Sequence, residues 1–349
     1  MQTITAQQRW LSGFSGPAIG VQILAASHGR QAALDGSSAL AGDRDRSQCQ
    51  LSLRVGPRIL PGTHFVEHRG ATSVACVTNT SGQGADNDDQ SVSLVSGQSA
   101  TLQEAVSAAA ELIEVARKIV VLTGAGISTD SRIPDFRGPQ GVWTKNPGAE
   151  KQATLQNYMV DQEMRRRSWR NRLDSPMWAA EPNPGHYALT GLERRRKLLL
   201  LVTQNVDGLH HDAGSNPERI VEIHGTAKHV GCMSCSYRAP MQEVLNRVRL
   251  GEDDPACPLC SGILKSATIS FGQSLITEDL ERAQEAAETC DLVLAVGSTL
   301  AVYPIAAVVP VAKRSGAGVV IVNGSPTEMD ELGDVVVNGS ISEVLPQLC

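Results

Sequence analysis

The sequence predicts an α/β fold built on a doubly wound parallel sheet, and three observations lead to that prediction. Short runs rich in Val, Leu and Ile, typical of buried parallel strands, recur at 118–123, 198–203, 292–296, 318–322 and 334–337. Segments with helical spacing, such as 278–290, separate most of them, as expected when helices join the strands. A glycine-rich turn directly follows the first run, where open α/β sheets bind their ligands.

A helix is predicted before the first strand, starting at Thr101, a residue type that can cap a helix. Its apolar residues recur at helical spacing: Leu102, Val106, Ala109, Leu112, Ile113 and Ala116. Two later stretches, about 140–190 and about 226–268, break the alternation of strand and helix. We expect both to be insertions that form a smaller lobe, within one domain over 101–349.

Residues 1–100 differ from the rest of the chain. They are rich in Ser, Gly, Gln and Asp, and 79–91 has the composition of a polar linker. We expect a disordered or weakly structured extension, or an over-long translation start. The first 34 residues lack Asp and Glu and include Arg9 and Arg30, which leaves an organelle-targeting segment as an alternative.

Composition excludes several classes of protein. The net charge of −6 over 349 residues argues against a general nucleic-acid binder, which is usually basic. No apolar run approaches the ~20 residues of a membrane-spanning helix, and the N-terminus lacks the features of a secretory signal. We therefore expect a cytoplasmic protein without membrane or nucleic-acid partners. The oligomeric state is left open.

The turn that begins at Gly124 is a candidate nucleotide site. Gly124-Ala125-Gly126 lacks the third glycine of the dinucleotide fingerprint, and no Walker lysine follows. Two close glycines after a strand still allow backbone amides to approach a pyrophosphate, although an ordinary tight turn is an alternative. The charged segment Pro134–Arg137 has no apolar periodicity, and a simple connector has no need of it.

A second polar group follows the strand 198–203. Gln204, Asn205 and Asp207 should project toward the same crevice as the Gly124 turn, because both follow the carboxyl ends of strands. Taken singly, Asn205 and Asp207 are ordinary turn formers. We interpret the neighbouring His210 and His211 as surface or capping residues.

His224 lies just before the cysteine region and beside the predicted crevice. A lone histidine is usually a structural residue. Its position favours a general base, since the ordinary pKa of about 6.5 suits proton transfer at neutral pH.

Four cysteines form two Cys-x-x-Cys pairs, Cys232 with Cys235 and Cys257 with Cys260. Four thiolates in two close pairs favour a structural Zn²⁺ site without an open coordination position. Two redox-active pairs are the alternative, but Gly262 after the second pair is more typical of a zinc knuckle. The other four cysteines, Cys49, Cys76, Cys290 and Cys349, receive no role.

Together these features resemble the sirtuin family of NAD-dependent protein deacylases, over roughly residues 102–349. The motifs that carry the resemblance occur in the family's order: GAGISTDSRIPDFRG (124–138), TQNVDGLH (203–210), EIHG (222–225), the two Cys-x-x-Cys pairs, SFG (270–272), GSTLAVYP (297–304) and VNGSPT (322–327). The resemblance implies a Rossmann-like NAD lobe, a small zinc-ribbon lobe, and an acyl-lysine peptide in the cleft between them.

The resemblance also implies the roles of individual residues. His224 becomes the general base, with Asn205 and Asp207 as further catalytic residues, and the four paired cysteines bind zinc. The implied NAD contacts in the glycine loop are Gly124, Ala125, Gly126, Ile127, Thr129, Asp135, Phe136, Arg137 and Trp143. Those of the nicotinamide and ribose pocket are Gln204, Asn205 and Asp207. Those of the adenosine side are Gly297, Ser298, Thr299, Asn323, Gly324, Ser325 and Ile341.

The implied reaction removes an acyl group from lysine and releases nicotinamide and O-acyl-ADP-ribose. Protein mono-ADP-ribosyl transfer would use the same NAD pocket, and a zinc-ribbon module that only senses NAD or ADP-ribose is the non-enzymatic alternative. The extended segment 268–272 could pair with the peptide as a strand. Arg132 departs from the family, which usually has glycine there, and this puts the activity of the loop in question.

The acyl group is predicted to be acetyl or another neutral group. Family members that act on acidic acyl chains have a Tyr-x-x-Arg pair, whereas this chain has Trp169-Arg-Asn-Arg172. The alternative is that the arginines between Arg165 and Arg172 are a solvated helix face.

Overall fold

The computed structural model describes residues 96–139, 141–146, 148 and 154–349. All of them belong to one compact unit. The expectations for residues 1–95, including Cys49, Cys76 and the linker at 79–91, lie outside the described residues. Among the described helices, none is long and apolar enough to cross a membrane.

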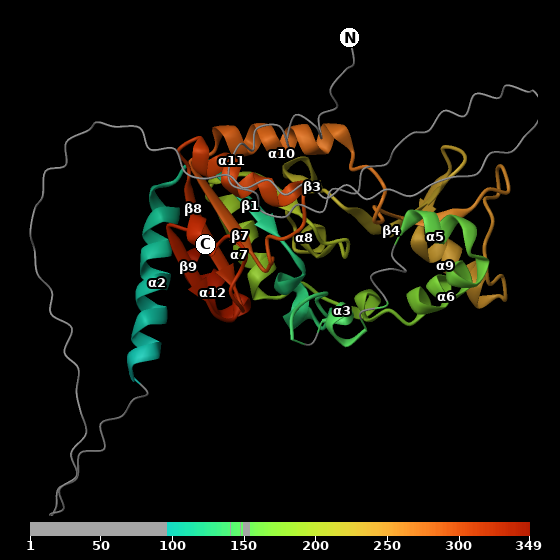
Figure 1. Ribbon diagram of the computed structural model, residues 1–349, viewed down its shortest axis with the longest axis horizontal. Coiled ribbons are helices and arrows are strands. Elements are labelled where there is room, and N and C mark those ends of the chain that lie inside the picture. The colour runs from blue at the N-terminus through green and yellow to red at the C-terminus, as the bar shows by residue number, and fades with distance from the viewer. Residues whose placement is uncertain (1–95, 140, 147, 149–153) are drawn as a thin grey trace, which may run out of the picture. The chain divides into compact units, whose positions relative to one another are not determined.

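A six-stranded parallel sheet forms the larger lobe, in the order β3-β2-β1-β7-β8-β9 (Figure 1). Its strands are β1 (Ile119–Thr123), β2 (Leu198–Thr203), β3 (Ile220–Glu222), β7 (Leu292–Val296), β8 (Gly318–Asn323) and β9 (Val335–Asn338). The residues of β1 and β7 are buried throughout, because helices cover both faces of the sheet. The predicted doubly wound α/β fold is confirmed, and the strand order reverses direction between β1 and β7.

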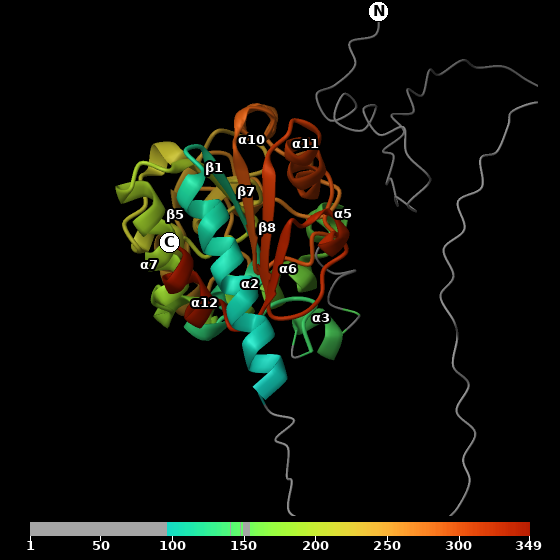
Figure 2. The same cartoon turned by 90° about the vertical axis from the view of Figure 1, so that its left-hand side faces the viewer.

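Two helical layers enclose this sheet. One face packs against α2 (Ser96–Val115), α7 (Pro184–Arg194) and α12 (Ile341–Leu348), as Figure 2 shows. The other face packs against α10 (Thr277–Thr289) and α11 (Val308–Arg314). The prediction that the first helix starts at Thr101 is wrong, since α2 begins at Ser96. No proline interrupts 96–100, and Gly97 costs a helix only about 1 kcal/mol.

The smaller lobe contains a three-stranded antiparallel sheet in the order β5-β4-β6. Its elements are β4 (Gly225–Cys232), β5 (Arg238–Pro240), β6 (Leu264–Thr268), α5 (Leu155–Val160), α6 (Gln162–Leu173) and α9 (Met241–Arg249). Its core forms around Trp169, which is fully buried against Val230, Leu245 and Leu264. The chain passes between the two sheets at Ile223–His224 and again at 269–276.

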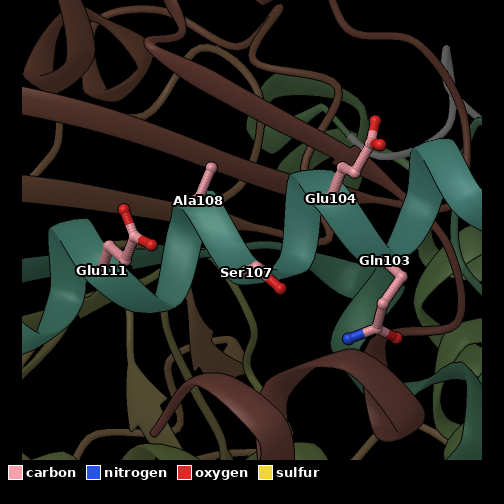
Figure 3. A pocket seen from close by; sticks show the side chains of 5 residues that line it. All are labelled: Gln103, Glu104, Ser107, Ala108 and Glu111. Atoms are coloured by element: carbon pink, nitrogen blue, oxygen red, sulfur yellow. The ribbon is translucent and has the colours of Figure 1, made fainter.

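The outer surface of α2 has a hollow lined by Gln103, Glu104, Ser107, Ala108 and Glu111 (Figure 3). All five residues belong to this one helix, and none is a predicted NAD or zinc contact. We therefore do not assign the active site to this hollow.

Candidate active site

The glycine turn after β1 packs directly on the loop after β7. A Cβ added at Gly124 would lie 2.7 Å from the carbonyl oxygen of Gly297, and one at Gly126 would lie 2.8 Å from the Gly297 Cα. The Gly126 N–H donates to the Gly297 carbonyl at 2.8 Å. Both glycines are required by this close approach, which brings the turn and Ser298 together where the sheet reverses direction.

The residues after β2 meet this turn. Gln204 donates through its backbone N–H to the Thr123 carbonyl and through its side-chain amide to Ser298 Oγ at 2.9 Å. The segments after β1, β2 and β7 are thereby joined by hydrogen bonds at one edge of the sheet. A nucleotide bound at this edge would contact all three segments.

Asn205 and Asp207 belong to a buried polar network. The Ser128 hydroxyl donates to Asp207 Oδ2 at 2.8 Å, and the Leu209 N–H donates to Asp207 Oδ1 at 2.9 Å. The Asn205 amide donates to Ser128 Oγ at 3.1 Å and to the Gly124 carbonyl at 3.2 Å. Asn205 is 8% exposed and Asp207 is 5% exposed, so this network fixes both side chains before any ligand binds.

We expect Ser128→Ala to lower the free energy of unfolding by about 1.5–3 kcal/mol, because the variant removes a buried hydrogen bond to a carboxylate. Urea denaturation at pH 7.5 measures this change. Ser315→Ala, at an exposed position, is the matched control. Equal and small losses in both variants would contradict the role of Ser128 in the network.

Two buried histidines complete the network: His186, which the sequence analysis does not name, and His210, which it places wrongly. His186 accepts the Asn183 N–H at Nδ1, and its Nε2 lies 3.5 Å from Ser128 Oγ. Burial lowers the pKa of His186 to about 4, against the opposing effect of Asp207. The interpretation of His210 as a surface or capping residue is wrong. It is 2% exposed, its Nε2 lies 3.0 Å from Thr123 Oγ1, and burial lowers its pKa well below 6.5.

His224 lies in the two-residue connection between β3 and β4. Its Nδ1 is 3.1 Å from the Gln204 carbonyl oxygen. Because a carbonyl can only accept, Nδ1 carries the proton and Nε2 keeps its lone pair. Burial lowers the pKa of His224, although its bond to Gln204 acts in the opposite direction. The ring is therefore neutral near pH 7, as a general base must be.

An aromatic cluster joins the glycine loop to the chain after β6. The rings of Phe136 and Trp143 are 4.7 Å apart, and those of Trp143 and Phe271 are 5.6 Å apart. The Arg137 guanidinium lies 4.6 Å from the centre of the Trp143 ring. Next to it, the Asp135 carboxylate accepts the Gly138 N–H at 3.1 Å. The cluster places Phe136 and Arg137 at the edge of the site.

Arg132 ends the short helix Ala125–Ser131 in a left-handed conformation, with φ of 66°. Its N–H donates to the carbonyls of Ser128 and Thr129. This geometry explains why glycine suits the position, because a side chain there costs about 1 kcal/mol or more. The structure accommodates Arg132 by leaving its side chain exposed.

The predicted adenosine contacts follow β7 and β8. Ser298 and Asn323 are each 9% exposed, and the Asn323 amide donates to the Ser325 carbonyl at 2.7 Å. Ile341 begins α12 and is buried in the same hydrophobic core as Ile127. Gly297, Thr299 and Gly324 lie on the same two loops.

The four paired cysteines converge as a metal site requires. Their sulfur atoms all lie within 4.8 Å of one another, with Cys232 and Cys260 at 3.5 Å and Cys235 and Cys257 at 3.6 Å. Two knuckles supply them from the same end of the small sheet, where Cys232 at the end of β4 pairs with Leu264 at the start of β6. Four thiols at these separations, with no other ligand type in the group, fit a tetrahedral structural zinc ion.

The arginines of α6 are not a uniformly solvated face, so that interpretation is wrong for two of them. Arg165 is 9% exposed and pairs with Asp254 at 3.0 Å. Arg172 is partly buried and donates to Ser266 Oγ at 3.1 Å. Arg166 and Arg170 do face solvent, where they pair with Glu163.

Comparison with known proteins identifies the class to which this fold and site belong. The chain matches the Sir2 family over residues 124–304. It is 47% identical over 230 residues to NAD-dependent protein deacetylase 2 of Streptomyces coelicolor, covering 66% of this chain and 95% of that protein. It is 39% identical over 247 residues to NAD-dependent protein deacetylase 1 of Bradyrhizobium diazoefficiens, covering 70% and 95%.

A solved structure agrees with these relatives. It contains a Sir2 variant with a deacetylated p53 peptide and 3′-O-acetyl ADP-ribose, and it superposes with a TM-score of 0.65. The sequence identity is 30%, over 69% of this chain and 96% of that one. The chain belongs to the Sir2 family, the sirtuins, and the predicted resemblance is confirmed.

Proposed function

We propose that this chain is an NAD-dependent protein lysine deacetylase or deacylase that releases nicotinamide and O-acyl-ADP-ribose. One observation carries the proposal: His224, whose Nδ1 proton is held by the Gln204 carbonyl, lies next to the segment of the buried Asn205 and Asp207 where the sheet reverses direction. Membership of the Sir2 family and the names of the relatives support the same activity.

The residues at the sheet edge fit NAD⁺. When bound, NAD⁺ supplies the nicotinamide leaving group and the ribose that takes the acyl group. The amides of the glycine turn and Arg137 would hold pyrophosphate charge, and Asn205 and Asp207 would hold the nicotinamide end. The Gln204–Ser298 hydrogen bond would orient the loop on the adenosine side. His224 would accept a proton at Nε2.

The acyl-lysine peptide is proposed to lie along 268–272. The Ile269 N–H donates to the His224 carbonyl at 2.7 Å, which holds this segment beside the base. Main-chain bonds to an extended segment would bind many peptide sequences, since they do not depend on side chains. Phe271 and its aromatic neighbours would then lie next to the bound peptide.

The test is incubation with an acetylated peptide and NAD⁺, followed by mass spectrometry. Equal amounts of deacetylated peptide, nicotinamide and O-acetyl-ADP-ribose are expected. ADP-ribosylated protein without deacetylated peptide would instead support mono-ADP-ribosyl transfer. Tight NAD⁺ binding without nicotinamide release would support the sensing module.

The acyl group itself gives a further prediction. We expect kcat/KM for an acetyl-lysine peptide to exceed that for a succinyl-lysine peptide by at least about tenfold, because Trp169 stands where family members that act on acidic acyl chains have the tyrosine of their Tyr-x-x-Arg pair. One observation favours acidic acyl chains as a second candidate. The buried Lys265 lies in β6 and Arg172 donates to Ser266 of the same strand, and in the part of the chain that the structure describes neither makes an ion pair with a carboxylate.

Acetyl-, succinyl- and long-chain-lysine peptides should be compared in the wild type and in Arg172→Met. Arg167→Met, at an exposed position on the same helix, is the control. A succinyl preference that disappears only in Arg172→Met would overturn the prediction of a neutral acyl group.

We also propose that 101–349 is a single catalytic domain with its small lobe built from inserted segments. A reducing compartment such as the cytoplasm is proposed as its location, since the four paired thiols must stay reduced to bind zinc.

A further inference from the structure

The turn that carries His224 is the shortest link between the two sheets. Its backbone is fixed on one side, where Ile269 donates to the His224 carbonyl. Gly225 has a φ of +70°, and a Cβ added there would lie 2.1 Å from the Ala267 carbonyl oxygen. The turn is therefore pressed against β6, and any residue that holds its opposite side also fixes the position of the base.

Glu222 holds that opposite side. It is the last residue of β3, and the side chain of Thr226 in β4 acts on its carboxyl group, lowering its pKa. This interaction spans the turn, because Glu222 and Thr226 lie two residues before and two residues after His224. The same carboxyl group lies 3.9 Å from His211 Nε2, and the Glu222 side chain is only 22% exposed.

The partner of Glu222 on the other side, His211, lies on the helix that directly follows Asp207. His211 lies in α8 (Leu209–Asp212), whose first N–H donates to the Asp207 carboxylate. The end of α8 is tied to β4 by an ion pair of 3.1 Å between Asp212 and Lys228. Glu222 thus joins α8, β3 and β4 at the point where the base leaves the large sheet.

We propose that Glu222 is a positioning residue for His224: its carboxyl group, between Thr226 and His211, clamps the turn and keeps the ring on the Gln204 carbonyl. The inference rests on the proposed function, in which His224 is the base. Glu222 does not touch the reacting atoms in this scheme and acts only through His224.

The electrostatic surroundings give the clamp a pH dependence. Burial raises the pKa of Glu222 to about 7, the Thr226 side chain and Lys228 lower it, and Asp207 and Asp279 raise it. His211 faces the same carboxyl group. Above about pH 7 the carboxylate is charged and interacts more strongly with Thr226 and Lys228, the two residues that favour its charged form. Below it the neutral acid holds the turn less firmly.

The same raised pKa predicts a stability cost. The folded state keeps the proton of Glu222 between the unfolded pKa of about 4.5 and the folded pKa of about 7, so stability contributed by this group falls as pH rises through that window. Glu222→Gln should therefore raise the melting temperature at pH 8 and leave it nearly unchanged at pH 4. A charged group that costs stability, as Glu222 does at pH 8, is expected where the charge serves function.

The deciding experiment introduces Glu222→Ala and Glu222→Gln separately into the wild-type protein and into the His224→Ala variant. In the wild type we expect Glu222→Ala to lower kcat about tenfold, with KM for NAD⁺ and peptide within about twofold, and Glu222→Gln to restore most of the loss. In His224→Ala the same change should alter residual turnover by less than about twofold, because a residue that acts through the base has nothing left to position. Glu218→Gln, at an exposed carboxyl, is the control.

A readout without turnover separates this inference from the proposed function. NMR titration of ¹³C-labelled histidines should show the pKa of His224 rising toward 6.5 in Glu222→Ala, as the loosened turn hydrates the ring, with that of His186 unchanged. An unchanged His224 titration, or equal losses of kcat in both backgrounds, would overturn the role of Glu222. Absence of deacylation by the wild-type protein would contradict the proposed function. The NMR titration of His224 would still decide whether Glu222 positions this ring.

Discussion

His224→Ala is expected to lower turnover with NAD⁺ and acetyl peptide by about 10²–10⁴-fold, the range typical of losing a general base. The structure explains why binding should survive. His224 contributes one side-chain bond, to the Gln204 backbone, whereas the glycine turn, Asn205 and Asp207 are held by other partners. Single-turnover assays measure the loss, and calorimetry should show NAD⁺ binding within about threefold of the wild type.

The pH profile checks the same assignment. Burial lowers the pKa of His224 below 6.5, so the loss of activity due to this ring should appear only on the acid side of pH 6.5. His229→Ala removes an exposed histidine from β4 and should keep full activity. A folded His224→Ala protein with turnover near that of the wild type would contradict the assignment of His224 as the general base.

Cys257→Ser should have the second large effect, on the fold as well as on activity. Cys257 is 3% exposed, and its neighbours in the small-lobe core include Trp169 and Leu264. Structural zinc in zinc-finger peptides binds with about 10–16 kcal/mol, and domains are stable by only about 5–15 kcal/mol. Losing one thiolate should therefore release the metal and unfold the small lobe.

The measurements are zinc content by mass spectrometry, melting temperature and tryptophan fluorescence, to which Trp169 contributes together with the three other tryptophans of the chain. Cys290→Ser changes another buried cysteine, in the core of the large lobe, and should keep its zinc. A Cys257→Ser protein with one equivalent of zinc and the wild-type melting temperature would contradict a structural metal.

The large sheet could be predicted because its strands are apolar on both faces. The run Leu198–Thr203 coincides with β2, since five of its six residues are buried. The ends of the strands are harder to predict than their centres, for a physical reason. β8 and β9 each end one residue beyond the predicted run, at Asn323 and Asn338, because backbone pairing continues after the apolar residues stop.

The network under the active site could not be predicted, because its members come from distant segments. Ser128 and Asp207 are separated by 79 residues, and Thr123 and His210 by 87. Arg165 and Arg172 are a different case. They lie four and three residues from the fully buried Trp169 and therefore share its face of the helix. Their helical spacing from Trp169 predicts that both are at least partly buried.

The pairing of β1 with β7 at the centre of the large sheet has a consequence for the chain while the ribosome is still making it. Ile119 of β1 pairs with Leu292 of β7, 173 residues further along the chain. At ~5–20 residues per second a ribosome needs roughly 10–35 s to make that interval. During this time one edge of a strand made of Ile, Val and Leu has no native partner. The nascent chain, rather than the finished fold, is the stage at which this protein is most exposed to aggregation.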